Sequence, residues 1–89
     1  MPCYTVVQVE VKDKTMAEAA LKQMKEKGTI KANSNGTFTV TPANQRGSFA
    51  DAFYKEYAAQ VTTRDAQKEG YYVNREEKDG EIHLTLRQY

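Results

Sequence analysis

The side chains best suited to chemistry in this 89-residue chain are its single histidine and its single cysteine, His83 and Cys3. A histidine changes charge near neutral pH, so His83 could serve as a general base or as a metal ligand. Glu81 and Thr85 lie two residues away on either side, but no second histidine or nearby cysteine completes a metal site. We therefore interpret His83 as a solvent-exposed strand residue, with a small-ligand pocket beside it as the alternative.

Cys3 cannot form an internal disulfide because the chain holds no other cysteine. A reactive thiol needs a cationic neighbour or a helix N-terminus, and Pro2 and Tyr4 supply neither, so we expect an inert thiol. The first residues lack the pattern of a signal peptide, and no apolar run approaches the roughly 20 residues that cross a bilayer. We expect a cytoplasmic protein that does not associate with membranes.

Tyrosines and arginines form a second group of candidate binding residues. Tyr71 and Tyr72 are adjacent, so on a strand one side chain faces inward and the other outward. An outward tyrosine beside Arg64, Arg75 or Arg87 could stack on nucleic-acid bases or contact another protein. A separate candidate is Arg46, which lies just before the start of a predicted helix. Backbone N–H groups at that helix start could hold an anion, with Arg46 helping.

Larger catalytic signatures are missing from the sequence. It contains no Ser-His-Asp arrangement, no Cys-x-x-Cys pair and no glycine-rich nucleotide loop. We expect no cofactor and no metal, and the sequence favours a binding protein over an enzyme.

The elements that must position these residues begin with a strand and a helix. Residues 4–11 alternate as a half-buried strand does, and residues 15–27 carry apolar side chains at helical spacing. Thr15 with Glu18 predicts a capping box, and Asp13 is a rival N-cap. Gly28 stands where a left-handed residue would end the helix.

Two hairpins and a long amphipathic helix follow. Asn35-Gly36 predicts a type I′ turn within residues 29–41, and Asp79-Gly80 predicts a second one within residues 71–89. Between them, a helix should begin after Ser48 and end at Gly70. The β-branched pair Thr62-Thr63 is a weak point, where the helix either bends or continues. Its apolar stripe consists of Phe49, Phe53, Tyr57 and Val61. In the last strand, Ile82, Leu84 and Leu86 should face inward, and His83, Thr85 and Arg87 outward.

The order β-α-β-β-α-β-β predicts a single two-layer α+β domain over residues 1–89, related to the ferredoxin-like arrangement. Two helices should pack on one face of a mainly antiparallel sheet and leave the other face polar and open. That open face would gather Thr37, Thr39, Thr41, His83, Thr85 and Arg87.

The C-terminal half of the chain, residues 49–89, is similar to a family of short, uncharacterised proteins from cyanobacteria, plastid genomes and phages. The resemblance is carried by Tyr57-Ala58, Gly70, Tyr72-Val73, Asp79-Gly80 and Tyr89. It implies a shared fold, and it supplies no catalytic residue because the family has no established activity.

Charge helps to rank the function classes. The chain has thirteen Lys and Arg residues and twelve Asp and Glu residues, so its formal net charge is +1. This near-neutral charge argues against binding of nucleic acid through a general excess of positive charge. We therefore favour a small binding or regulatory module that acts through a protein surface or by self-association, such as an inhibitor encoded by a phage or mobile element. A nucleic-acid-binding domain is the alternative, and a small-ligand binder or enzyme near His83 is the second alternative.

Overall fold

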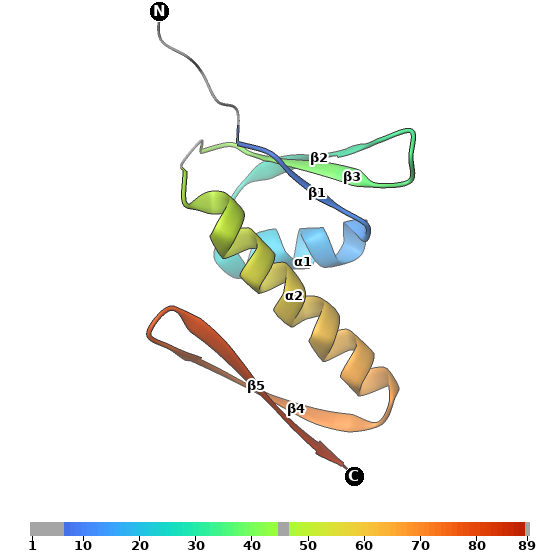
Figure 1. Ribbon diagram of the computed structural model, residues 1–89, viewed down its shortest axis with the longest axis vertical. Coiled ribbons are helices and arrows are strands. Elements are labelled where there is room, and N and C mark those ends of the chain that lie inside the picture. The colour runs from blue at the N-terminus through green and yellow to red at the C-terminus, as the bar shows by residue number, and fades with distance from the viewer. Residues whose placement is uncertain (1–6, 45–46, 89) are drawn as a thin grey trace, which may run out of the picture.

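The computed structural model describes residues 7–44 and 47–88. Its elements are β1 (Val9–Val11), α1 (Lys14–Met24), β2 (Gly28–Ala32), β3 (Phe38–Pro42), α2 (Phe49–Lys68), β4 (Tyr71–Lys78) and β5 (Glu81–Gln88) (Figure 1). Every strand pair is antiparallel. The element order and the α+β class predicted from the sequence are confirmed.

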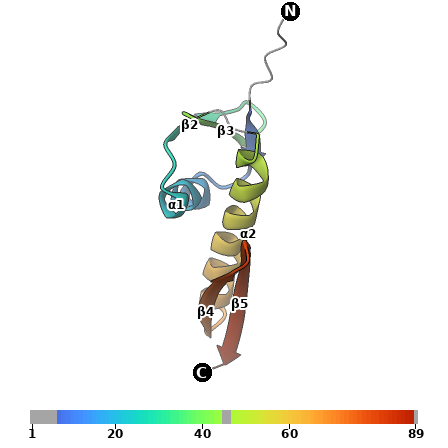
Figure 2. The ribbon, with the colours of Figure 1, turned by 90° about the vertical axis from the view of Figure 1, so that its left-hand side faces the viewer.

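A three-stranded sheet with the order β1-β3-β2 supports the main core. Its central residue Val40 is fully buried and lies opposite Val9 on β1 and Ile30 on β2. Both helices pack on this one face, as predicted (Figure 2). The fully or largely buried core residues are Val9, Val11, Ala17, Ala20, Leu21, Val40, Phe49 and Phe53.

Helix α1 begins at Lys14 because Asp13, the rival cap, is its N-cap. The Asp13 carboxylate accepts a hydrogen bond from the backbone N–H of Met16 at 3.1 Å, so the predicted capping box at Thr15 does not form. Asp13 also binds the guanidinium of Arg64 and, through its backbone N–H, the hydroxyl of Tyr57 at 3.1 Å. The start of α1 is thereby fastened to α2.

The end of α1 corrects the prediction for Gly28. The helix ends at Met24, and Lys25 takes the left-handed conformation with φ 58°. Gly28 instead opens β2, where a Cβ atom would lie 2.6 Å from the carbonyl oxygen of Thr41. The glycine is needed for close approach of two strands and not for a helix cap.

The first hairpin turns where the sequence predicts, but its turn type differs. Only Gly36 has a positive φ, 84°, whereas a type I′ turn requires positive φ at Asn35 as well. Asn33 closes the longer loop by donating its backbone N–H to the Thr37 carbonyl at 2.9 Å. Its side-chain amide also donates to the hydroxyls of Thr37 and Thr39.

Helix α2 is continuous over 20 residues and passes through Thr62-Thr63, so of the two alternatives that the sequence left open the helix continues there. Two of its faces are buried. Phe49 and Phe53 pack into the main core, with their rings 5.4 Å apart. A second face, formed by Glu56, Ala59 and Ala66, is buried towards the C-terminal hairpin. The helix therefore joins two packed layers.

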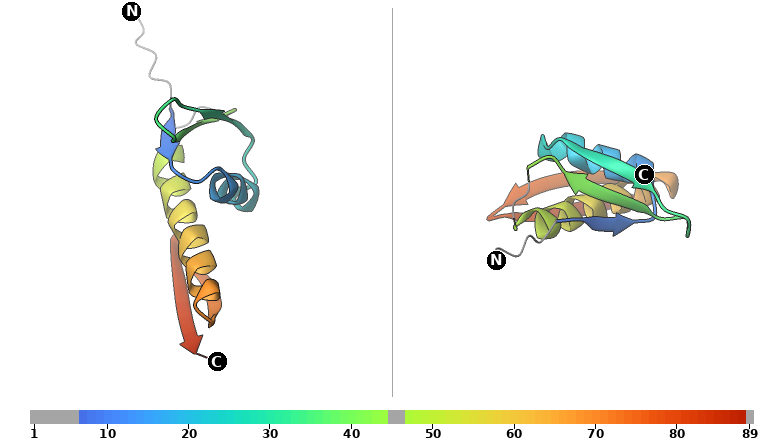
Figure 3. Two further views of the ribbon diagram at one scale, coloured as in Figure 1. Left: turned by 90° about the vertical axis from the view of Figure 1, so that its right-hand side faces the viewer. Right: turned by 90° about the horizontal axis from the view of Figure 1, so that it is seen from above.

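The strands do not join one sheet, which corrects the expectation of a single open face. β4 and β5 form a separate two-stranded sheet along the C-terminal part of α2, away from β1, β2 and β3 (Figures 1 and 3). A 20-residue helix is about 30 Å long, so α2 carries the chain well past the end of strands of three to five residues. The predicted surface is split: Thr39 and Thr41 lie on β3 with Thr37 in the loop just before it, and His83, Thr85 and Arg87 lie on β5 in the other sheet.

Neither helix in the described part of the chain is long and apolar enough to cross a membrane.

Candidate functional site

The β4–β5 hairpin holds most of the predicted site residues. Asp79 and Gly80 have φ values of 54° and 75°, so the predicted type I′ turn is confirmed here. The register pairs Lys78 with Glu81 and continues without a bulge to Tyr71 and Gln88. The face turned away from α2, called the outer face below, carries Tyr72, Asn74, Glu76, Lys78, Glu81, His83, Thr85 and Arg87.

Four predicted site residues lie together on this outer face. Tyr72 pairs directly with Arg87 across the strands, and Thr85 and His83 follow along β5. Tyr72 is 59% exposed, and Tyr71 is half-buried on the inner face, as the adjacent-tyrosine argument predicted. A shallow hollow of about 310 Å³ lies between Tyr72, Thr85 and Arg87.

Arg75 does not belong to this surface. Its side chain turns towards α2, and its guanidinium makes two hydrogen bonds of 2.6 Å to the carboxylate of Glu56. It also binds Glu77 at 2.9 Å. Arg75 attaches the hairpin to the helix. Its guanidinium is engaged by Glu56 and Glu77 and is not positioned to bind an external ligand.

Glu56 is the charged residue that sequence reasoning missed. Its side chain is only 5% exposed, and Arg75 and Gln60 both donate to it. Burial raises the pKa of the Glu56 carboxyl, but the hydrogen bonds from Arg75 and Gln60 and the charge of Arg75 outweigh it, so the net pKa is below the ordinary value. The same contact with Glu56 raises the pKa of Arg75.

Two predicted candidates cannot be placed. Arg46, the proposed anion-binding residue, and Cys3, the thiol considered first, both lie outside the described residues. Ser48 is the N-cap of α2, as predicted, but its side chain makes no capping hydrogen bond.

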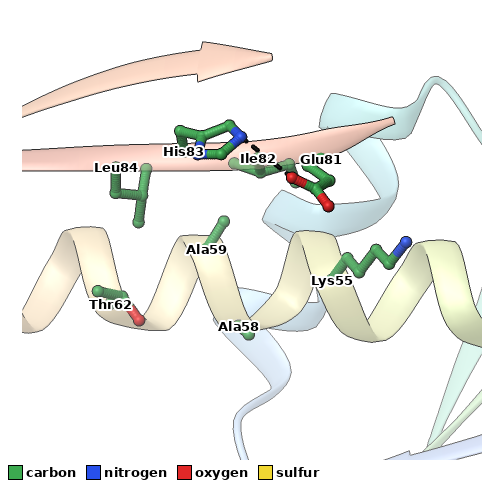
Figure 4. Close-up of a pocket in the computed structure, with 8 residues that line it drawn as sticks. All are labelled: Lys55, Ala58, Ala59, Thr62, Glu81, Ile82, His83 and Leu84. Atoms are coloured by element: carbon green, nitrogen blue, oxygen red, sulfur yellow. Dashed lines mark ion pairs between the residues drawn. The ribbon is translucent and has the colours of Figure 1, made fainter. Parts of the chain in front are cut away.

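A groove runs between β5 and α2 on the inner side of the hairpin (Figure 4). It has a volume of about 430 Å³ and is called the hairpin groove. Its lining residues are Lys55, Ala58, Ala59 and Thr62 on α2 and Glu81, Ile82, His83 and Leu84 on β5. Leu84 points from the strand towards the helix, and Ala58 and Ala59 are too short to fill the space. The result is an apolar floor with a polar rim.

His83 stands on that rim. The Nε2 atom of its ring lies 3.2 Å from a carboxylate oxygen of Glu81, and its side chain is 55% exposed (Figure 4). The groove floor contains no cysteine or serine. This arrangement suits the docking of apolar side chains better than a reaction, because His83 and Glu81 engage each other on the solvent side.

The sequence did contain one signal for the second buried face of α2. Ala52, Glu56, Ala59 and Ala66 recur at helical spacing beside the phenylalanine stripe. Small residues at such positions let a second layer, here the hairpin, approach the helix. A search for apolar periodicity does not detect this face because Glu56 is charged. Only its contact with Arg75 explains why a carboxylate belongs there.

Comparison of the chain with protein-family models, with curated proteins and with solved structures gives no significant match. Among the described residues, no group of three or more His, Cys, Asp or Glu side chains is placed to hold a metal ion.

Proposed function

We propose that this chain is a non-enzymatic protein-binding module that takes up an extended segment of a partner along the free edge of β5. The observation that carries the proposal is the hairpin groove, an apolar space beside a strand of eight residues that pairs only with β4 in the described chain. Addition of a strand to an exposed edge gives affinity through backbone hydrogen bonds and specificity through alternate side chains.

The partner segment should alternate apolar and polar residues. In such a strand, the apolar side chains would lie over Ala58 and Thr62 and extend the inner face formed by Ile82 and Leu84. Its polar face should place a basic residue opposite Glu81 and an acidic residue opposite Arg87, because opposite charges stabilise cross-strand pairs.

The test uses a short synthetic peptide of alternating leucine and threonine with one arginine and one glutamate at its ends. The control peptide has the same composition in an order that does not alternate. We expect the alternating peptide to shift the backbone amide NMR signals of Ile82, Leu84 and Leu86 and to slow their hydrogen exchange. Equal effects of both peptides, or no effect on β5, would contradict the proposal.

A groove variant gives a second check. Ala58→Arg places a long side chain in the groove without harming helix propensity, so it should weaken peptide binding. Gln67→Arg introduces the same residue on the same helix at a position outside the groove lining, and it should bind the peptide as the unaltered protein does.

The outer face supports a second candidate function, binding of single-stranded nucleic acid. Exposed Tyr72 directly opposite Arg87 could stack a base and contact a phosphate. Glu76 and Glu81 on the same face oppose this function. Binding of a labelled oligonucleotide that weakens with salt and with Tyr72→Ala would support it, and no binding at low salt would exclude it.

A further inference from the structure

We propose that the strand bound by β5 is β5 of a second copy of this chain, in an antiparallel pair whose twofold axis passes beside Leu84. The inference rests on the proposed binding mode and names its partner. It predicts a four-stranded antiparallel sheet in the order β4-β5-β5-β4, with one α2 helix from each copy on its inner face.

Comparison of the sheet edges favours β5. β1 is an edge of only three residues, and the β2 edge carries Lys31 and opens on Gly28. β4 is as long as β5, but it carries four charged residues in succession at 75–78. Short strands and charged side chains, lysine above all, discourage pairing at an edge. β5 contains no lysine, and Ile82, Leu84 and Leu86 follow one another on its inner face.

The backbone of β5 presents its free groups at these same apolar residues. In a type I′ hairpin the residues that flank the turn, Lys78 and Glu81, form a hydrogen-bonded pair, and such pairs alternate along an antiparallel ladder. The N–H and C=O groups of Glu81, His83 and Thr85 therefore point towards β4. Those of Ile82, Leu84 and Leu86 point to the free edge, where a second strand can bind them.

Side-chain complementarity selects the register. With Leu84 opposite Leu84 of the second copy, Ile82 lies opposite Leu86 on the inner face. On the outer face, Glu81 lies opposite Arg87, and His83 opposite Thr85, twice each by symmetry. The two ion pairs and the apolar contacts all arise from one strand paired with itself, so charge complementarity supports a second copy as the occupant.

Neighbouring registers lose this complementarity. A shift centred on Thr85 puts His83 opposite Arg87, which removes the partner of Glu81 and opposes two basic side chains. A shift centred on His83 brings Asp79 opposite Arg87, but Asp79 is in the turn with φ 54° and lies outside the strand.

On the inner face, the proposed dimer would bury apolar surface that is exposed in the single chain. Leu86 is 45% exposed although its neighbours Ile82 and Leu84 are half-buried under α2. In the proposed register Leu86 lies opposite Ile82 of the second copy, at the edge of that copy's hairpin groove. Each chain would then cover the apolar surface that the other leaves exposed, which stabilises association.

Cysteine cross-linking tests the register. In a Cys3→Ser background, one chain carries His83→Cys and another carries Thr85→Cys. These positions form a pair without hydrogen bonds, with Cα atoms about 4.5 Å apart, which allows a disulfide. Two copies of the same variant would have their cysteines about 8 Å apart, too far for a disulfide.

We therefore expect the mixture of the two variants to form a covalent dimer, and each variant alone to form little of it. A mixture of Lys31→Cys and Thr85→Cys is the control for random collision, because Lys31 is exposed on the other sheet. Equal cross-linking of the single variants and the mixture would overturn the proposed register.

Charge reversal tests the pairs without touching the apolar face. Arg87→Glu should raise the dissociation constant of the dimer about tenfold, because it opposes two pairs of carboxylates. The double variant Glu81→Arg/Arg87→Glu should restore association, and Lys31→Glu, with the same change in net charge, should leave it unchanged. Analytical ultracentrifugation measures the dissociation constant of each of the three variants.

The outcomes separate this inference from the proposed function. A chain that stays monomeric to about millimolar concentration but binds the alternating peptide at β5 overturns the second copy as partner and leaves the binding mode in place. A dimer unaffected by Arg87→Glu and not cross-linked through positions 83 and 85 also overturns the inference. A monomer that binds no peptide overturns both.

Discussion

Glu56 and Arg75 determine how the hairpin is attached to the rest of the molecule. A carboxylate that is 5% exposed is stable only with a charged partner, and Arg75 meets it with two hydrogen bonds of 2.6 Å. These two residues come from separate elements, α2 and β4. This ion pair therefore acts together with the apolar packing of α2 against the hairpin to fix the position of the surface proposed to bind a partner.

Removal of one residue of the Glu56–Arg75 pair should destabilise the protein far more than removal of both. Arg75→Met leaves Glu56 buried without a cation, and we expect it to lower the free energy of unfolding by about 3 kcal/mol. The double variant Glu56→Met/Arg75→Met replaces the pair with apolar side chains of similar length and should recover most of that loss. Urea denaturation of the single and double variants measures this difference, and equal losses in both would contradict the account.

Acid should weaken the same attachment. The folded-state pKa of Glu56 is below its ordinary value of 4.5, so the unfolded chain binds the proton more tightly. The stability from this group is fully present above pH 4.5 and is lost as the pH falls through the lowered folded pKa. Asp13 behaves alike, because the hydrogen bonds from Arg64 and Met16 lower its pKa.

Denaturation midpoints measured from neutral pH down to acid should therefore decrease for the unaltered protein. Glu56→Gln removes the titrating group, so its stability should depend less on pH in the acid range. A variant that loses stability with acid as steeply as the unaltered protein would show that Glu56 does not contribute.

Strands β2 and β3 approach each other closely at Gly28. A methyl group there would lie 2.6 Å from the Thr41 carbonyl oxygen, which belongs to the backbone and cannot move aside. We expect Gly28→Ala to lower the free energy of unfolding by about 1–3 kcal/mol. Gly47→Ala is the matched control, since no atom lies within 4 Å of the added methyl group. Thermal or urea denaturation compares the two, and equal effects would contradict the close-approach argument.

Helix α2 is the element that both parts of the molecule share. Phe49 and Phe53 face the three-stranded sheet and α1, and Ala59 and Ala66 are buried towards the hairpin. Its length, about 30 Å, keeps the two sheets apart. The same helix that builds the core therefore leaves β5 with a free edge and a groove.

The whole molecule is elongated for its size. Its radius of gyration is 14.7 Å, and its extents are 57 × 34 × 16 Å. A compact domain of this length would have a radius of gyration of about 12 Å. The hairpin adds to the length of the molecule, because it lies beyond the three-stranded sheet along α2 (Figure 1). A thin layer of two strands on one helix is the kind of structure that gains most from a second copy.

If the chain dimerises through β5, its thermal stability should depend on concentration. Each tenfold rise in protein concentration should raise the melting temperature by about 3–5 °C while the dimer is the folded species. Arg87→Glu should reduce this dependence. Calorimetry over a range of concentrations measures it, and a melting temperature independent of concentration would contradict dimerisation.

The sequence by itself determined the order of the elements and the positions of both turns. These depend on local signals: alternation in β5, helical spacing in α2, and Asp79-Gly80 with positive φ at both residues. Local signals also placed His83, Thr85 and Arg87 on one face, because side chains two apart on a strand share a side.

Only the tertiary structure decided how these parts meet. Three features depend on contacts between distant segments. Arg75 turns inward to Glu56, Gly28 allows β2 and β3 to approach closely, and the strands divide between two sheets. No spacing in the sequence encodes such contacts, since they follow from the length of α2 and from which faces remain to be buried. For the same reason the hairpin groove, formed by α2 and β5 together, became visible only in three dimensions.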